Sequence, residues 1–271
     1  MEPTSYFHWT GSPEIFRIGA FAIRWYGVLF ALGFIIGYQI MTYIFKKENK
    51  PIKELESLVL YVILGTVIGA RLGHCLFYEP EYYLSNPLEI IKVWHGGLAS
   101  HGGAIGVLLA LWLFSRKHKK INLLWLLDRI VIPTALVASL IRIGNFFNHE
   151  IIGKPTDVPW AIIFNVYQGN QVIGTTPPVH PSQLYESVSY LIIFVLLFLF
   201  YKKKILQRPG VPFGLFFVLV FTARFFLEFT KAPQADFEQY LPLSMGQILS
   251  IPFVLVGLYF LLRKQIKGTS S

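Results

Sequence analysis

The chain has 271 residues, of which 54% are hydrophobic and only 14% are charged. A soluble domain has roughly a quarter of its residues charged, so the composition indicates a polytopic membrane protein. The formal net charge of +9 raises the question of nucleic acid, but basic residues in short loops between apolar segments are what membrane orientation requires. We therefore expect a membrane environment and no nucleic-acid partner. The single cysteine, Cys75, excludes an internal disulfide and a cysteine-based metal cluster.

Seven segments are apolar enough to cross roughly 30 Å of hydrocarbon, which takes about twenty residues each. They run over 18–45, 58–78, 98–115, 123–147, 183–201, 214–229 and 244–262, and the third and sixth are short. The predicted fold class is therefore an all-α polytopic membrane protein with about seven transmembrane helices. We expect one integral membrane domain over residues 1–271.

Lysine and arginine residues predict the orientation, because they gather after the first, third, fifth and seventh spans. The positive-inside rule places these connections in the cytoplasm, with the N-terminus outside and the C-terminus inside. The residues are Lys46, Lys47, Lys50, Lys53, Arg116, Lys117, Lys119, Lys120, Lys202, Lys203, Lys204, Arg208, Arg263, Lys264 and Lys267.

The connection between the fourth and fifth spans is about thirty residues long, which is long for a loop. Its β-branched and aromatic run at 160–166 predicts a short strand. We expect residues 150–180 to form a small periplasmic subdomain inserted in the membrane domain. Elsewhere, glycines at helical spacing predict close helix packing; they are Gly65, Gly69, Gly73, Gly102, Gly103 and Gly106.

Polar residues inside the predicted spans lie almost entirely near the outer ends. A polar group in hydrocarbon costs several kcal/mol unless it is paired, so such a concentration predicts a functional site. The residues are Tyr26, Arg71, His74, His101, Arg142, Asn145, Asn148, Glu150, His180, Gln183, Glu186, Arg224 and Glu228. Asp128 and Arg129, near the cytoplasmic start of the fourth span, are interpreted as an interfacial pair. A transporter would need a polar path through both halves, so we predict one cavity open to the outer leaflet.

The spacing of these residues fits an anionic lipid headgroup. On a helix, Arg142, Asn145 and His149 share one face, as do Arg224 and Glu228. Two arginines can clamp a phosphate with forked hydrogen bonds, and a helix start at 180–183 would favour an anion too. Three simpler interpretations stay open: a helix end among headgroups, an ion pair between Arg224 and Glu228, and a His101 bonded to a facing helix.

The common catalytic motifs of membrane enzymes are missing. The sequence has no His-Glu-x-x-His, no Gly-x-Ser-x-Gly and no glycine-rich phosphate loop. Acidic residues at depth are too sparse for a magnesium site, so we expect no metal and no cofactor. The remaining groups suit a site that binds a phosphodiester, assists a leaving phosphate and accepts a proton, without a protein nucleophile.

Several motifs resemble those of the prolipoprotein diacylglyceryl transferase family over nearly the whole chain. Arg142 to Glu150 matches the family signature Gly-Arg-x-Gly-Asn-Phe-x-Asn-x-Glu, with Ile141 in place of the first glycine. Residues 94–103 resemble the second motif, in which His101 takes the place of the proposed catalytic base. Further matches are 25–27, 69–73, Gly153, 180–186, 224–228 and 244–247, whereas Val220 replaces a tyrosine of some members.

The resemblance implies an enzyme of the bacterial inner membrane with its site toward the periplasmic leaflet. Such an enzyme moves the diacylglyceryl group of phosphatidylglycerol onto the lipobox cysteine of a prolipoprotein signal peptide and releases glycerol phosphate. The implied catalytic residues are His101, Arg142, Arg224, Glu150 and Tyr26. The implied phosphatidylglycerol-binding residues are Arg142, Asn145, Asn148, Gly153, Arg224, Glu228, His180, Gln183 and Arg71. The alternatives are a non-catalytic phospholipid-binding or transport protein, and a phospholipid headgroup transferase or hydrolase.

The orientation can be tested by labelling single cysteines in a Cys75→Ala background. We expect Lys47→Cys, His118→Cys and Lys203→Cys to be shielded from an impermeant thiol reagent applied outside, and Gly169→Cys to be labelled. Labelling at position 203 without labelling at 169 would reverse the orientation and move the site to the other leaflet.

Overall fold

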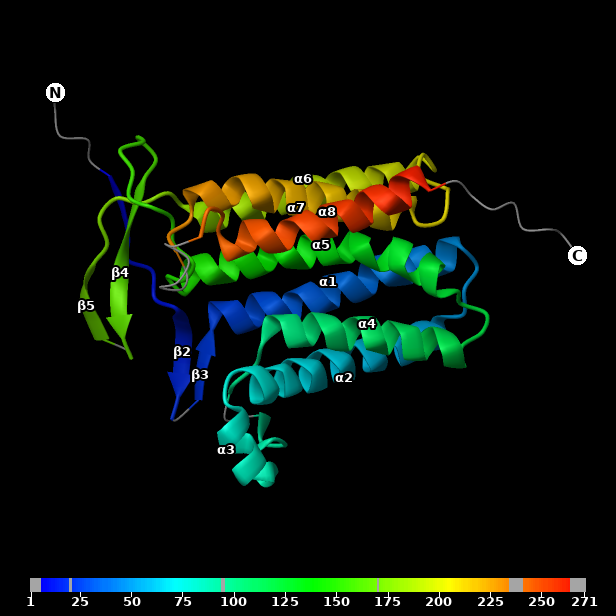
Figure 1. Cartoon of the computed structure of the whole chain (residues 1–271), viewed down its shortest axis with the longest axis horizontal. Coiled ribbons are helices and arrows are strands. Elements are labelled where there is room, and N and C mark those ends of the chain that lie inside the picture. The colour runs from blue at the N-terminus through cyan, green and yellow to red at the C-terminus, as the bar shows by residue number, and fades with distance from the viewer. Residues whose placement is uncertain (1–5, 20, 94–95, 170, 234–240, 264–271) are drawn as a thin grey trace, which may run out of the picture. The chain divides into compact units, whose positions relative to one another are not determined.

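A computed structural model describes residues 6–19, 21–93, 96–169, 171–233 and 241–263. Figure 1 shows the helices and strands of the chain, which divides into two compact units. Unit 1 comprises Met1–Gly37 and Ile130–Ser271, and unit 2 comprises Tyr38–Arg129. Two long helices pass from one unit to the other: α1, Trp25–Lys47, and α5, Leu123–Phe147. Each unit is described below by itself.

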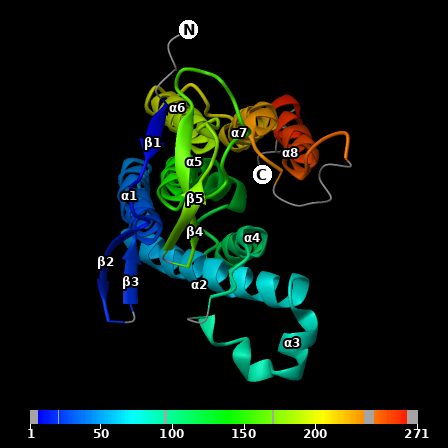
Figure 2. The ribbon, with the colours of Figure 1, turned by 90° about the vertical axis from the view of Figure 1, so that its left-hand side faces the viewer.

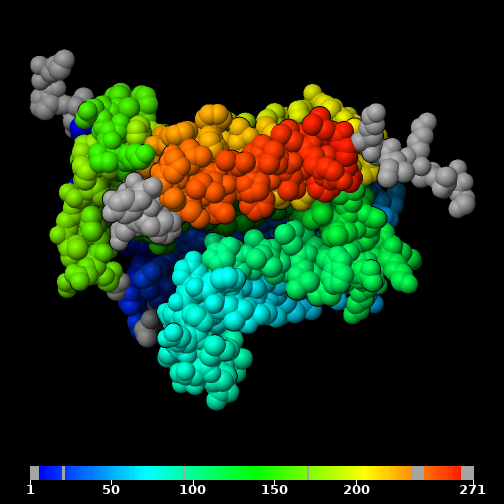
Figure 3. All heavy atoms as spheres, viewed as in Figure 1, coloured from blue at the N-terminus to red at the C-terminus, as the bar shows by residue number. Residues whose placement is uncertain are grey.

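Unit 1 contains parts of α1 and α5 together with three further helices. These are α6, Ser182–Lys202, α7, Val211–Leu227, and α8, Met245–Leu262. Helix α7 packs against both α6 and α8, as Figures 1 and 2 show, and α8 faces the viewer in Figure 3 (orange to red). The approach of α7 and α8 depends on small residues, because a Cβ on Gly214 would lie 2.7 Å from the Gly257 carbonyl oxygen.

Local sequence signals set where these helices begin. Helix α8 starts with a capping box, in which Ser244 accepts from the Gln247 amide and the Gln247 side chain accepts from the Ser244 amide. Helix α7 follows Gly210, whose φ of 87° favours glycine, and has a proline in its first turn. A short 3₁₀ turn, η3, Glu228–Thr230, continues α7.

Unit 1 also contains two small sheets, so the prediction of an all-α fold is wrong. Strands β1, Phe7–Trp9, β4, Ile162–Gln168, and β5, Gln171–Thr175, form a sheet in the order β1-β4-β5, with β1 parallel to β4. Strand β4 confirms the strand predicted around 160–166. Strands β2, Glu14–Ile18, and β3, Phe21–Arg24, form a hairpin.

The hairpin also corrects the predicted first span, which was expected to begin at residue 18. The chain stays extended until Arg24, and α1 begins at Trp25. A run of aromatic and β-branched residues at 15–18 and 21–23 pairs as strands although it is apolar enough for a membrane helix. The three-stranded sheet has its own core of Phe146, Ile162, Phe164 and Val179, with Trp9, Ile152 and Leu184 packed against it.

Unit 2 is organised around two tightly packed helices, α2, Ile52–Phe77, and α4, Ser100–Lys117. A Cβ on Gly69 would lie 2.4 Å from the Gly102 carbonyl oxygen, and one on Gly106 would lie 2.1 Å from that of Gly65. The predicted close packing is therefore confirmed, except that Gly103 has ordinary room. The short helices α3, Pro80–Ser85, and η1, Pro87–Glu89, follow α2.

Charged groups meet where α1 ends and α5 begins, within unit 2. Glu48 accepts hydrogen bonds from Trp125 and Arg129, and Asp128 lies 3.7 Å from Arg129 with only 1% of its side chain exposed. The predicted pair of Asp128 and Arg129 is thus present, with Glu48 added to it.

Within the described residues, six helices are long and apolar enough to cross a membrane, rather than the seven predicted. They are α1, α2, α5, α6, α7 with η3, and α8. Helix α4 is the exception, because its 18 residues begin with Ser100 and His101, include three glycines and end with Arg116 and Lys117. The protein is a mostly helical, polytopic membrane protein with a small region of sheet.

The glycine packing predicts a sharp difference between two adjacent positions on α4. Gly102→Ala should destabilise the protein by about 1–3 kcal/mol, as overpacking typically does, because its Cβ would lie 2.4 Å from a backbone oxygen of α2. Gly103→Ala is the matched control, since its nearest neighbour lies 3.5 Å away. Thermal denaturation in detergent measures both; equal stability of the two variants would contradict the close packing.

Candidate functional site

The site begins where α5 ends and the chain turns back. Helix α5 stops at Phe147, and the Glu150 amide donates to the Asn145 carbonyl oxygen at 3.0 Å. His149 and Ile151 have positive φ values of 56° and 55°. This tight turn brings the carboxylate of Glu150 back beside the last helical residues.

Three amide side chains converge on Glu150. Asn145 and Asn148 donate to its carboxylate oxygens at 3.2 and 3.3 Å, and Gln183 of α6 donates to its backbone oxygen at 2.6 Å. Arg142 donates to Asn145 Oδ1 at 3.1 Å. The structure therefore brings together five of the residues selected from the sequence.

A buried charge cluster lies next to this group of amides and consists of Arg142, Glu186, Lys231 and Glu228. Arg142 Nε lies 2.9 Å from Glu186 Oε2, and Lys231 Nζ lies 3.0 Å from Glu186 Oε1 and 3.0 Å from Glu228 Oε2. The Tyr190 hydroxyl donates to Glu186 Oε1 at 3.1 Å. Exposed fractions of the side chains are 0% for Glu186, 4% for Lys231, 6% for Glu228 and 14% for Arg142. Buried charges require partners of this kind.

Gly153 holds the backbone of this cluster together. Its amide donates to the His180 carbonyl oxygen at 3.1 Å, and it forms a β-bridge with Lys231. A Cβ at this position would lie 2.2 Å from the His180 oxygen, so a larger residue would separate the segments. Ser182 adds a hydrogen bond to the Thr230 carbonyl oxygen at 3.0 Å. The sequence predicted a phosphatidylglycerol contact at Gly153; the structure gives this glycine a packing function beside the charges.

Tyr26 lies at the start of α1, against the turn of α5 that carries Arg142 and Asn145. A Cβ on Gly144 would lie 2.8 Å from the Tyr26 ring, and the neighbouring Trp25 stacks on Phe147 at 4.9 Å. The absence of a side chain at Gly144 therefore lets the phenol approach the arginine-bearing helix.

Arg224 and Glu228 do not form the intrahelical pair that was one alternative for them. Glu228 pairs with Lys231 instead, and within the described parts of the chain no ion pair joins Arg224 to a carboxylate. Arg224 is half-buried on α7. It therefore keeps a charge that an anionic ligand could use.

Two histidines near the charge cluster, His180 and His149, contact other groups. His180 Nδ1 lies 3.3 Å from the Tyr185 hydroxyl, which accepts from Trp160 at 2.6 Å. The prediction that His149 shares a helix face with Arg142 is wrong, because α5 ends at Phe147. The Nε2 atom of His149 lies 2.8 Å from the Gly11 carbonyl oxygen. Burial lowers the pKa of His149, which favours the neutral imidazole.

Unit 2 holds the other predicted site residues, Arg71 and His101. Arg71 is 3% exposed, donates to the carbonyl oxygens of Glu89, Ile90, Gly96 and Gly97, and lies over the Tyr83 ring. This geometry orders the loop that precedes α4, and its predicted contact with lipid stays a prediction. His101 is exposed in the first turn of α4 and stacks on Tyr78 at 5.8 Å. Trp94 and His95 of the second motif lie outside the described residues.

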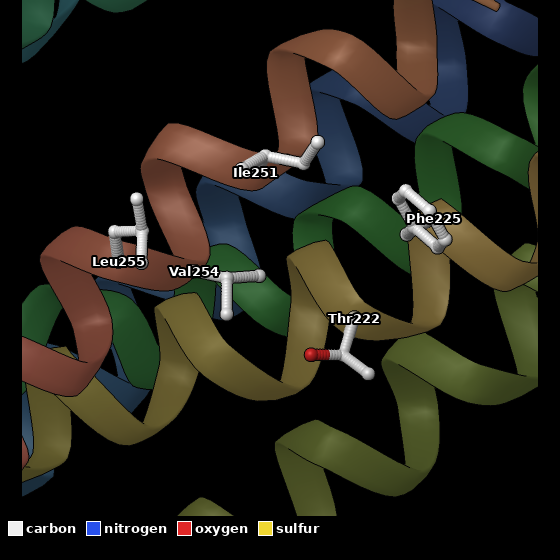
Figure 4. A pocket seen from close by; sticks show the side chains of 5 residues that line it. All are labelled: Thr222, Phe225, Ile251, Val254 and Leu255. Atoms are coloured by element: carbon white, nitrogen blue, oxygen red, sulfur yellow. The ribbon is translucent and has the colours of Figure 1, made fainter. Parts of the chain in front are cut away.

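An apolar groove of about 210 Å³ lies between α7 and α8 (Figure 4). It is lined by Thr222, Phe225, Ile251, Val254 and Leu255. It has no charged group, so it suits hydrocarbon and not a headgroup. Among the described histidines, cysteines and carboxylates, no three gather to hold a metal ion.

Sequence reasoning missed the importance of Glu186 and Lys231. Glu186 was recognised as polar but received no role, and Lys231 was not selected because it follows the sixth predicted span. A usable signal was present, since a glutamate inside the apolar run 183–201 requires a buried cation. Which cation supplies it depends on the tertiary fold.

The fold and the cluster together define a class: a polytopic membrane protein with buried arginine, lysine and carboxylate groups at one end of its helices. A sequence profile described as prolipoprotein diacylglyceryl transferase matches residues 13–263. The phosphatidylglycerol–prolipoprotein diacylglyceryl transferase of Tolumonas auensis is 51% identical over 254 residues, 94% of this chain and 96% of that protein. The protein of the same name from Chloroherpeton thalassium is 52% identical over the whole of both chains, and that from Porphyromonas gingivalis is 43% identical over 94% and 93%. The chain belongs to the prolipoprotein diacylglyceryl transferase family.

Proposed function

We propose that this protein transfers the diacylglyceryl group of phosphatidylglycerol to the lipobox cysteine of prolipoproteins. Relatives that match 94% and 100% of the chain carry the name of this activity. The observation in the structure that supports it most is the position of Arg142, held between Glu186 and Asn145 beside the buried side chains of Glu186, Lys231 and Glu228. A guanidinium fixed in this way is preorganised for a phosphate.

The reaction breaks the bond between the glyceryl carbon and the phosphate oxygen, and it forms a thioether between that carbon and the cysteine sulfur. The bonding electrons leave with glycerol phosphate, so negative charge grows on the phosphate in the transition state. The substrate supplies the nucleophile, and the thiol proton passes to a base. The enzyme therefore has three tasks: to hold the lipid, to stabilise the leaving phosphate and to accept a proton.

We assign the phosphate to Arg142 and Arg224, with Asn145, Asn148, Gln183, His180 and Gly153 shaping the site around it. Tyr26 lies against the same turn of α5 and can donate a hydrogen bond to a lipid oxygen. Glu228 and Glu150 hold the surrounding cations and amides. His101 is the first candidate for the base because its ring is exposed, and Glu150, also exposed, is the second.

The proposed setting is a bacterial inner membrane with this site toward the periplasmic leaflet. The basic connections after α1, α4 and α6 would then face the cytoplasm, an arrangement in which α4 crosses the membrane together with the six more apolar helices. The sheet of β1, β4 and β5 would lie on the periplasmic side, where secreted precursors present the lipobox.

The activity itself is tested by incubating purified protein in detergent with phosphatidylglycerol and a lipobox peptide. A thioether on the peptide supports the proposal. Phospholipid breakdown without modified peptide would favour a hydrolase or headgroup transferase, and lipid binding without either product would favour a binding protein.

The arginines should act mainly on turnover. Loss of one contact that stabilises the transition state in a dry site costs about 100- to 1000-fold in rate, so we expect Arg142→Ala and Arg224→Ala to lower kcat by that range. Lysine should restore activity only partly, because it loses the forked geometry. Arg17→Ala is the control, since Arg17 forms an exposed ion pair with Glu14 on β2. A rise in KM with unchanged kcat would show that the arginines bind lipid and transition state equally.

His101 should show a different dependence on pH. A thiol with an unperturbed pKa of roughly 8.5 needs less help from a base as the pH rises. If His101 accepts the proton, the His101→Ala defect should shrink toward alkaline pH, whereas the arginine defects should not. The measurement is a pH–rate profile of each variant. A His101→Ala defect that stays constant with pH would leave Glu150 or Glu228 as the candidate proton acceptor.

A further inference from the structure

Glu186 has an unusual number of partners for a side chain inside a predicted membrane helix. Its carboxylate is fully buried and meets Arg142 at 2.9 Å, Lys231 at 3.0 Å and the Tyr190 hydroxyl at 3.1 Å. A carboxylate buried in such surroundings requires cations and donors beside it. One of these cations is Arg142, which is assigned to the lipid phosphate. The second cation, Lys231, therefore determines how strongly Glu186 attracts Arg142 and neutralises its charge.

The backbone fixes Lys231 at this point. Its amide donates to the Glu228 carbonyl oxygen at 3.1 Å, and its β-bridge with Gly153 ties it to the segment that follows Glu150. With 4% of its side chain exposed, the ammonium lies between two carboxylates, 3.0 Å from each. Gly246 of α8 packs directly on Glu228, where a Cβ would lie 2.4 Å from the carboxyl carbon. Lys231 is therefore enclosed by protein groups.

The arrangement leaves one edge of Arg142 for a ligand. Nε lies on Glu186 and Nη1 donates to Asn145, whereas Nη2 has no hydrogen-bond partner among the residues that the structure describes. The four charges of the cluster sum to zero. Without Lys231 the cluster would carry a net negative charge beside the position assigned to an anionic phosphate, and Glu186 would draw Arg142 toward itself.

We propose that Lys231 is a positioning residue for the transfer reaction: by neutralising Glu186 and Glu228, it leaves the terminal edge of Arg142 oriented and charged for the lipid phosphate. This inference rests on the proposed function. Lys231 itself contacts neither the lipid nor the peptide.

The proposal predicts how Lys231→Met combines with Arg142→Ala. Changes in a supporting layer of a site typically cost about 10- to 100-fold in activity, so Lys231→Met should lower kcat by that range. Because Lys231 acts through Arg142, Arg142→Ala with Lys231→Met should be no slower than Arg142→Ala alone. Lys231→Arg should recover most of the rate. Lys154→Met is the control, since Lys154 is exposed on the neighbouring segment. Defects that multiply in the double variant, or a Lys231→Arg enzyme as slow as Lys231→Met, would overturn the proposal.

Removal of a buried cation can also prevent folding, so a charge-matched pair carries the test independently. Glu228→Gln with Lys231→Met keeps the cluster neutral and leaves Arg142 paired with Glu186. We expect it to be slower than Glu228→Gln alone, because Arg142 is then the only cation left for Glu186 and is drawn toward it. Equal rates of these two variants would show that Arg142 does not need Lys231 and would reject the inference. Wild-type enzyme without thioether product would reject the proposed function itself, whereas active wild type with an unimpaired Lys231→Met would reject this inference alone.

Discussion

The fully buried carboxylate of Glu186 in the interior of a membrane protein is the constraint on which the rest of the site depends. Burial of an unpaired charge is so unfavourable that the surrounding elements must supply cations and donors. They come from three separate stretches: Arg142 from α5, Tyr190 from α6 itself and Lys231 from the turn after η3. The network thereby joins helices that are far apart in sequence. It also gives Arg142 a fixed direction, which loose side chains at a membrane surface would lack.

Glycine performs a complementary function by allowing backbones to approach the charged groups and one another. At Gly153 three segments meet with no room for a Cβ, and at Gly246 the absent side chain makes room for Glu228. At Gly144 the same absence admits Tyr26. Hydrophobic attraction between helices is weak in lipid, so close backbone packing and polar contacts supply much of the association. In this protein, close backbone packing and polar contacts occur together at Gly153 and Gly246.

The sequence predicted the long helices and placed several polar residues near the ends of these helices, because apolar length and the cost of buried charge are properties of single segments. It predicted Arg142, Asn145, Asn148 and Glu150 as neighbours, which their short spacing allows. It did not predict the hairpin at 14–24, where apolar strands and an apolar helix have the same composition, nor the partner of Glu228. Arg224 lies four residues before Glu228, the spacing of an intrahelical pair, but the ion pair forms with Lys231, which follows a 3₁₀ turn three residues after Glu228. Such pairings depend on the path of the chain after a helix ends, which periodicity does not record.

The pairing of β1 with β4 has a consequence for the order in which the molecule is made. Phe7 to Trp9 pair with Ile162 to Phe164, so the first described strand has no partner until more than half of the chain has been synthesised. Non-local contacts of this kind form slowly, because a long loop must close before they contribute. The segment that carries β1 therefore stays without its β4 partner while the intervening helices are synthesised. Insertion of the intervening helices comes first, and the small sheet closes late in biogenesis.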